Sequence, residues 1–177
     1  DRLCAAFCGI ADWMTLPACA VSTSNAFLRY SVSAGSNAWL EAQWYLFAGI
    51  VMLGASYTLQ RNEHVRVDLV YGNLRWKARI WVDIVGIAFF LLPAMALLAW
   101  MTWPFFVDSW VRGETSSTPG GLVRWPAKIL LPVGFALVTA QGASELIKRI
   151  ALLRPRWRSQ LLAGGSAVVA DYARPEQ

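Results

Sequence analysis

The segment QRNEHVRVDLVYGNLRWK, residues 60–77, contains the side chains that are most suited to chemistry. It holds the only histidine of the chain, His64, beside Glu63 and four residues before Asp68. Residues four apart share a face of a helix, so His64 and Asp68 have a spacing that suits a metal ion, with Glu63 as a third ligand. Three ligands are a bare minimum, and we favour the competing interpretation that this is a polar segment at a membrane surface.

Other patterns of catalysis and cofactor binding are missing from the sequence. It has no Cys-x-x-Cys-His motif, no glycine-rich phosphate loop and no Ser/His/carboxylate set in a recognisable context. A single histidine also falls short of the histidine pairs that usually hold haem in a membrane bundle. We therefore expect no enzymatic activity, no catalytic residue, no metal site and no cofactor in this chain.

Long uncharged stretches decide the fold class. The chain is 56% hydrophobic and only 15% charged, whereas soluble domains carry roughly 25% charged residues. Residues 84–107, 42–60 and 129–144 hold no charge, and residues 3–28 are broken only by Asp12. A helix of about 20 mostly apolar residues crosses the hydrocarbon of a bilayer. The sequence therefore predicts an all-α integral membrane protein with four transmembrane helices, at Leu3–Leu28, Leu40–Gln60, Trp81–Val107 and Pro126–Ile147.

The distribution of lysine and arginine predicts the orientation. With four spans, twelve of the sixteen basic residues lie on one side, in the N-terminus, the second loop and the C-terminal tail. Cytoplasmic loops carry the excess of basic residues. We therefore expect both termini in the cytoplasm, with a short amphipathic connector between the second and third helices. Residues 1–153 would form the transmembrane domain and residues 154–177 a mobile cytoplasmic tail. The net charge of +5 then indicates contact with anionic lipid and not with nucleic acid.

Some residues within the spans are candidates for helix contacts. Asp12 is ionisable and lies within the first span, so it is a candidate for partner contact, with a packing or interfacial position as the alternative. Cys4, Cys8 and Cys19 fall on one face of the first helix, which favours a packing face. Small residues of the second and fourth spans suit close helix approach, within this chain or toward a partner: Gly49, Gly54, Ala55, Ser56, Ala136, Ala140 and Ser144.

Short motifs along the chain occur in the order of a known family. They are Arg29-Tyr30 after the first span, Glu41 at the head of the second, His64-Val65-Arg66-Val67-Asp68 after it, and Gly120-Gly121-Leu122 with Trp125-Pro126 and Lys128 before the fourth. Val123 departs from the pattern, which has proline there. Over roughly Phe27–Leu153 the chain resembles the small membrane subunit, the Q-type or DctQ component, of tripartite ATP-independent periplasmic (TRAP) transporters.

The resemblance implies an accessory scaffold subunit in a bacterial inner membrane. It would pair with a large membrane subunit that holds the sodium and substrate sites, while a periplasmic solute-binding protein delivers an organic acid. Candidates for contact with the large subunit or with lipid are Asp12, His64, Arg66, Asp68 and Trp76. Candidates for docking the binding protein are Arg29, Glu41, Arg112, Glu114 and Arg124.

Two functions of other classes remain open at this point. One is a stand-alone membrane anchor or assembly subunit of a redox complex, which would co-purify with haem or quinone. The other is an independent small channel, which would conduct as a purified chain.

Overall fold

The computed structural model describes residues 2–31, 36–62, 74–118 and 120–153, and the regular elements in these ranges are helices. They are α1 (Arg2–Ser31), α2 (Asn37–Arg61), α4 (Trp76–Val85), the π-helix η1 (Gly86–Leu91), α5 (Leu92–Arg112) and α6 (Trp125–Leu152). The expected connector around His64, Arg66 and Asp68 and the expected tail 154–177 lie outside the described residues.

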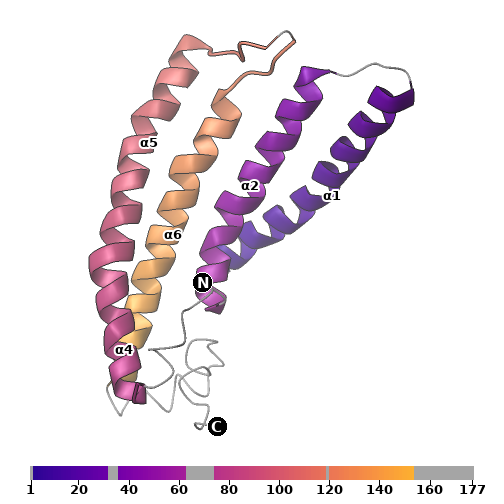
Figure 1. Ribbon diagram of the computed structural model, residues 1–177. Helices are drawn as coiled ribbons and strands as arrows, with labels where there is room; N and C mark the ends of the chain where they lie inside the picture. Colours follow the sequence, from indigo (N-terminus) through magenta and orange to yellow (C-terminus); the bar gives the residue numbers. More distant parts are fainter. Residues whose placement is uncertain (1, 32–35, 63–73, 119, 154–177) are drawn as a thin grey trace.

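The helices run up and down between two ends of the molecule. In Figure 1, α1 rises from the lower end, α2 returns to it, α4, η1 and α5 rise again, and α6 descends. The start of α1 and the end of α6 therefore lie at the same end, which we call the inner end. The chain that links α1 to α2 and the loop that links α5 to α6 lie at the opposite end, which we call the outer end.

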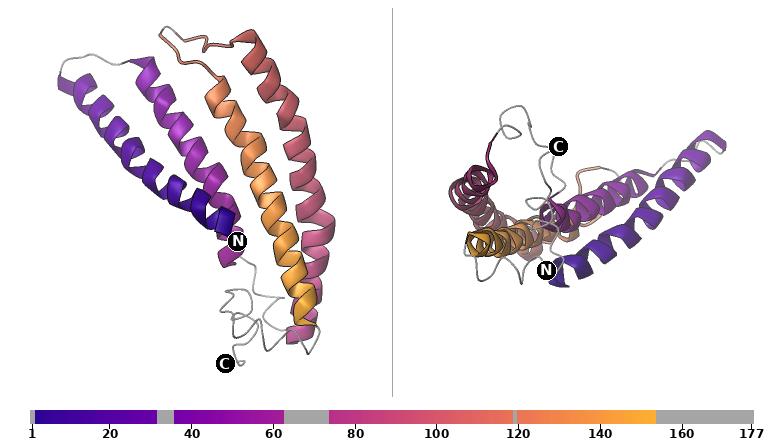
Figure 2. Two further views of the ribbon diagram at one scale, coloured as in Figure 1. Left: turned by 180° about the vertical axis from the view of Figure 1, so that it is seen from behind. Right: turned by 90° about the horizontal axis from the view of Figure 1, so that it is seen from below.

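The helices form one row and not a closed bundle. The principal contacts join α1 to α2, α2 to α6, and α6 to the helix formed by α4, η1 and α5. Figures 1 and 2 show the resulting order, with α1 at one edge and α5 at the other. Such a row leaves broad apolar faces uncovered; among the described residues, large side chains such as Trp13, Phe89 and Trp100 are more than 70% exposed. These faces fit contact with lipid or with another membrane protein, because water would disfavour them.

Small residues allow the neighbouring helices to approach closely. A Cβ atom added to Gly134 of α6 would lie 2.7 Å from Cβ of Met52 on α2, and one added to Gly49 of α2 would collide with Met14 of α1. On α1 the buried residues recur every seven positions: Cys4, Ala11, Ala18 and Asn25. This spacing keeps a single stripe of α1 against α2.

The structure corrects one predicted packing face and narrows another. Cys4 is buried on α1, but Cys19 is exposed, so the three cysteines do not form the packing face. Ala136 and Ala140 of α6 are exposed, and Gly134 and Gly142 make the close approaches within this chain; a role for the alanine face toward a partner stays a prediction. Sequence spacing identifies which residues share a face, but it does not say which face meets the neighbouring helix.

The third long helix contains a π-helical turn directly before a proline. The π-helix Gly86–Leu91 ends immediately before Leu92, and Pro93 then lies in the first turn of α5. Proline has no N–H to donate and is tolerated in the first turn of a helical segment. Such a turn is not needed at every proline, because Pro17, Pro104 and Pro132 lie inside α1, α5 and α6, which continue through them.

Three helices are long and apolar enough to cross a membrane: Cys4–Ser31, Lys77–Arg112 and Trp125–Leu152. The expected count of four is therefore met only in part, because α2 is helical over 25 residues but less apolar. Its polar and aromatic residues, among them Glu41, Gln43, Trp44, Tyr45 and Gln60, account for the difference.

Candidate functional site

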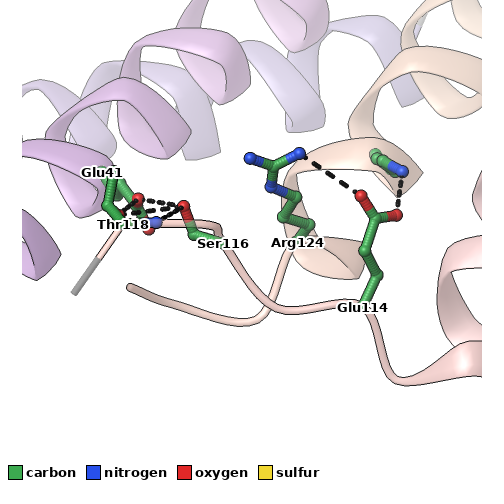
Figure 3. A network of polar contacts seen from close by, with 6 residues as sticks. Glu41, Glu114, Ser116, Thr118 and Arg124 are labelled. Atoms are coloured by element: carbon green, nitrogen blue, oxygen red, sulfur yellow. Dashed lines mark hydrogen bonds and ion pairs between the residues drawn. The ribbon is translucent and has the colours of Figure 1, made fainter. Parts of the chain in front are cut away.

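A carboxylate on α2 holds the outer loop between α5 and α6. Oε1 of Glu41 accepts hydrogen bonds from the hydroxyl groups of Ser116 and Thr118, and Oε2 accepts one from the backbone N–H of Leu122 at 2.7 Å. Figure 3 shows the two hydroxyl groups directed at this carboxylate. Hydrogen bonds to an ionised acceptor are stronger than those between neutral groups. Glu41 therefore holds the loop against the N-terminal end of α2.

The loop itself is a tight hairpin built on glycines. Gly113 and Gly120 have φ angles of 60° and 74°, a region that favours glycine. Thr115 pairs with Val123, the N–H of Ser116 donates to the carbonyl of Leu122, and the N–H of Arg124 donates to the carbonyl of Glu114. Valine at position 123, where the family pattern has proline, is thus compatible with a closed loop.

A second carboxylate ties the loop to the start of α6. Glu114 pairs with Lys128 and, at 3.3 Å, with Arg124 (Figure 3). The hydrogen bond from Lys128 is the main reason why the pKa of Glu114 is lowered from its ordinary value. Lys128 also lies 4.0 Å from the centre of the Phe105 ring, so one ammonium group links the loop, α5 and α6.

The structure brings together three of the five residues predicted at the outer face. Glu41, Glu114 and Arg124 hold the loop in place. Their partners include Ser116, which the sequence analysis did not name, and Lys128, which it named only as part of the family motif. Arg112 lies apart and pairs with Asp108 at 2.7 Å. Arg29 is exposed in the last turn of α1. The predicted docking role of these residues stays a prediction.

The inner end contains a buried charged cluster that the sequence analysis missed. Glu145 and Arg149 of α6 are 0% and 1% exposed, and their side chains approach to 3.6 Å. Arg149 also lies 3.5 Å from Asp83 of α4 and donates to Asn62, the C-cap of α2. One guanidinium group thus joins α2, α4 and α6 at this end.

Two more side chains complete the cluster around the Glu145 carboxylate. The amide of Gln141 and the ammonium group of Lys148 each donate to Oε1 at 2.9 Å. Lys148 and Arg149 lie just beyond the predicted end of the fourth span at Ile147, and the structure continues α6 past both of them to Leu152. The spacing of Gln141, Glu145 and Arg149, four residues apart on an otherwise apolar helix, was the available signal.

Asp12 lies on the exposed surface of α1. Its interaction in the structure is a long contact of 3.9 Å from the thiol of Cys8, one turn earlier. The position is within the candidate membrane span Cys4–Ser31. An ionisable side chain in such a span normally faces protein or water, so the exposed position of Asp12 fits both a contact with a partner and a place near the membrane surface.

The structure says little about the other predicted site residues. His64, Arg66 and Asp68 lie outside the described residues, so the metal hypothesis for that segment is untested. Trp76 begins α4. Within the described ranges, no three residues of the types His, Cys, Asp and Glu come close enough to hold a metal ion.

The chain is similar to known membrane-transport components. Residues 18–152 match the family described as tripartite ATP-independent periplasmic transporters, DctQ component. A relative from Vibrio cholerae, the C4-dicarboxylate TRAP transporter small permease protein DctQ, is 26% identical over 136 residues, which cover 66% of this chain and 59% of the relative. The matched region thus spans less than two thirds of that relative's length. No solved structure matches the chain.

Proposed function

The chain belongs to the DctQ family of TRAP transporter components, and on that premise we propose that it is the scaffold subunit of a sodium-driven uptake system for organic acids. It is a multi-pass membrane protein and a transport subunit, not an enzyme. The family match over residues 18–152 is the observation that carries the proposal. The sodium and substrate sites are assigned to the partner large subunit.

The proposed membrane topology has four spans, with α2 as the fourth member. A helix of 25 residues is roughly 37 Å long, which is enough to cross the hydrocarbon. α2 packs between α1 and α6, both of which are candidate spans, so it shares their depth. The excess of lysine and arginine in the sequence between α2 and α4 and after α6 supports a cytoplasmic location for both termini.

The proposed contact with the large subunit includes Asp12. This carboxylate faces outward from a helix long enough to span the membrane, and a basic or hydrogen-bonding side chain of the large subunit would complement it. His64, Arg66, Asp68 and Trp76 are proposed to extend this contact, or a contact with lipid, on the cytoplasmic side.

The proposed docking surface for the periplasmic binding protein is the outer loop. Glu41, Glu114 and Arg124 hold the loop in one conformation through contacts within the chain. A fixed surface loses less conformational entropy on docking than a mobile loop does. Arg112 and Arg29 are the exposed basic residues of this end that belong to the same proposal.

Co-purification tests the proposal directly. The full chain carrying an affinity tag is purified in mild detergent from membranes of its own bacterium, and the co-eluting proteins are identified by mass spectrometry. We expect one large multi-span membrane protein in constant ratio to the chain. Recovery of a haem- or quinone-containing complex instead would support the redox-anchor alternative, and single-channel conductance of the chain alone would support the channel.

A matched pair of variants tests the role of Asp12. Asp12→Asn removes the charge while it keeps the shape, and we expect it to lower the yield of the large subunit relative to the tagged chain. Asp108→Asn is the control, because Asp108 is also exposed but lies at the outer end, paired with Arg112. Equal yields from both variants would remove Asp12 from the interface.

A further inference from the structure

We propose that the outer ends of α1 and α2 form a binding site for the phosphate-bearing headgroup of a membrane phospholipid. A crevice of about 560 Å³ lies between these two helices and is lined by polar side chains from both. Ser22, Asn25 and Arg29 come from α1, and Gln43 comes from α2.

Asn25 presents a side-chain amide to the crevice. Its side chain is only 8% exposed, and it occupies the outermost position of the buried stripe that begins at Cys4. The other members of the stripe, Cys4, Ala11 and Ala18, are hydrophobic and need no hydrogen-bond partner. In the part of the chain that the structure describes, no hydrogen bond reaches the amide of Asn25. The amide is not sealed off inside the protein but lines the crevice, so it can donate a hydrogen bond to a phosphate oxygen placed there.

Arg29 supplies the matching charge. It lies one turn above Asn25 on α1, and no ion pair with a carboxylate is formed by it among the described residues. The carboxylates of the outer end have other partners: Glu41 holds the loop, Glu114 pairs with Lys128, and Asp108 pairs with Arg112. A guanidinium group is suited to phosphate, because its planar donors bind two oxygens at once.

The depth of the crevice indicates a lipid as the source of the phosphate. Arg29 lies at the end of the candidate span Cys4–Ser31, and Ser22 lies seven residues, or roughly 10 Å, further into it. The exposed tryptophans Trp39 and Trp44 lie on the adjoining turns of α2, as expected at headgroup level. The anion that is abundant at this depth is the phosphate of a phospholipid. The site therefore needs membrane insertion but no transport partner, and the lipid contact of Arg29 is tested separately from its proposed part in docking the binding protein.

Native mass spectrometry of the full chain in detergent tests the site. The delipidated chain is titrated with dioleoyl phosphatidylglycerol, with dioleoylglycerol, which has the same acyl chains and no phosphate, and with inorganic phosphate. We expect one phosphatidylglycerol to bind tightly and the other two compounds to bind at least about tenfold more weakly, since the charge-assisted hydrogen bonds are lost with either the phosphate or the anchoring chains.

Three variants test whether phosphatidylglycerol binds in the crevice between α1 and α2. Arg29→Gln and Asn25→Leu are expected to weaken phosphatidylglycerol binding by about tenfold or more. Arg112→Gln, which removes an exposed charge from the far side of the same end, is expected to leave it unchanged. Because Arg29 is exposed, its variant tests the site even where Asn25→Leu does not fold.

Several results would overturn the proposal. Equal binding of dioleoylglycerol would show that the crevice takes acyl chains alone, and equal binding of inorganic phosphate would show that it takes a free anion. An equal loss in Arg29→Gln and Arg112→Gln would show only general attraction between a basic surface and an anionic lipid.

Discussion

Replacing Arg149 by methionine tests whether the buried charged cluster at the inner end holds α2, α4 and α6 together. The substitution keeps the length of the side chain and removes its charge. It leaves Glu145, which is fully buried, and Asp83, which is mostly buried, without the guanidinium group between them. The contact from α6 to Asn62 at the end of α2 is lost as well.

The expected loss of stability follows from the burial of Arg149 and Glu145. Removal of one partner of a buried ion pair destabilises a protein by about 3–5 kcal/mol, because a charge is left uncompensated. Lys148 still donates to Glu145 at 2.9 Å in the variant, which favours the lower end of that range. A loss of about 3 kcal/mol corresponds to a fall of roughly 6–12 °C in the unfolding midpoint of a chain of this size.

The assay is thermal unfolding of the full chain in detergent, followed by the fraction that elutes as a monodisperse peak. Lys148→Met is the control, since Lys148 is partly exposed and Arg149 remains beside Glu145. A loss of about 1 kcal/mol is expected for that variant. Adding Glu145→Gln to Arg149→Met neutralises the stranded carboxylate, and we expect the double variant to unfold at a higher temperature than Arg149→Met alone.

The reasoning is refuted by either of two outcomes. The first is an Arg149→Met chain that unfolds within about 2 °C of the Lys148→Met chain, which is less than 1 kcal/mol of difference. The second is a double variant that is less stable than Arg149→Met, which would mean that the stranded carboxylate is not the source of the loss.

Three further predictions concern the outer loop and the contact between α2 and α6. Glu41→Gln weakens the fastening of the loop, so amide hydrogen exchange of residues 113–124 is expected to become faster than in the parent chain; unchanged exchange would contradict the role of that carboxylate. The pKa of Glu114 is lowered in the folded chain, so its pairing with Lys128 contributes stability above the ordinary carboxyl pKa and loses it as the pH falls through the folded-state value. The unfolding midpoint of Glu114→Gln should therefore fall less on acidification than that of the parent. Gly134→Ala places a Cβ atom 2.7 Å from a methionine of α2 and should cost about 1–3 kcal/mol, whereas Gly54→Ala, with no neighbour within 4 Å, should cost nothing. Equal midpoints for these two alanine variants would show that α2 and α6 do not pack closely at Gly134.

The sequence predicted the elements of the fold better than their contacts. Uncharged stretches and helical length identified all four long helices, because a bilayer demands apolar residues over a fixed length. The structure extends them beyond the predicted ends, from Val107 to Arg112 in the third helix and from Ile147 to Leu152 in the fourth. Charged residues in the last turns ended the predicted spans, yet Arg149 remains helical and buried because Glu145 and Asp83 neutralise it.

At the candidate sites, too, the sequence predicted some of the residues but not their contacts. Glu41, Glu114 and Arg124 were predicted as charged residues of the outer face, but the sequence did not show their contacts. Glu41, for example, is 75 residues from its partner Ser116. The amide of Asn25 gave no signal at all in the sequence. Its importance comes from its position between two helices, where it lines the same crevice as Arg29 and Gln43.

The sequence by itself determined that this is a helical membrane protein of a transporter family, with few groups capable of chemistry. Hydrophobic length, charge distribution and short motifs are local properties of the sequence, so they do not depend on how the helices are arranged. Only the tertiary structure decided that the helices form an open row, that Gly134 and not Ala136 meets the neighbouring helix, and that Arg149 joins three helices. These outcomes depend on contacts between residues that are far apart in the sequence. Many helix arrangements would bury the same apolar residues, and the close packing of particular side chains selects one of them.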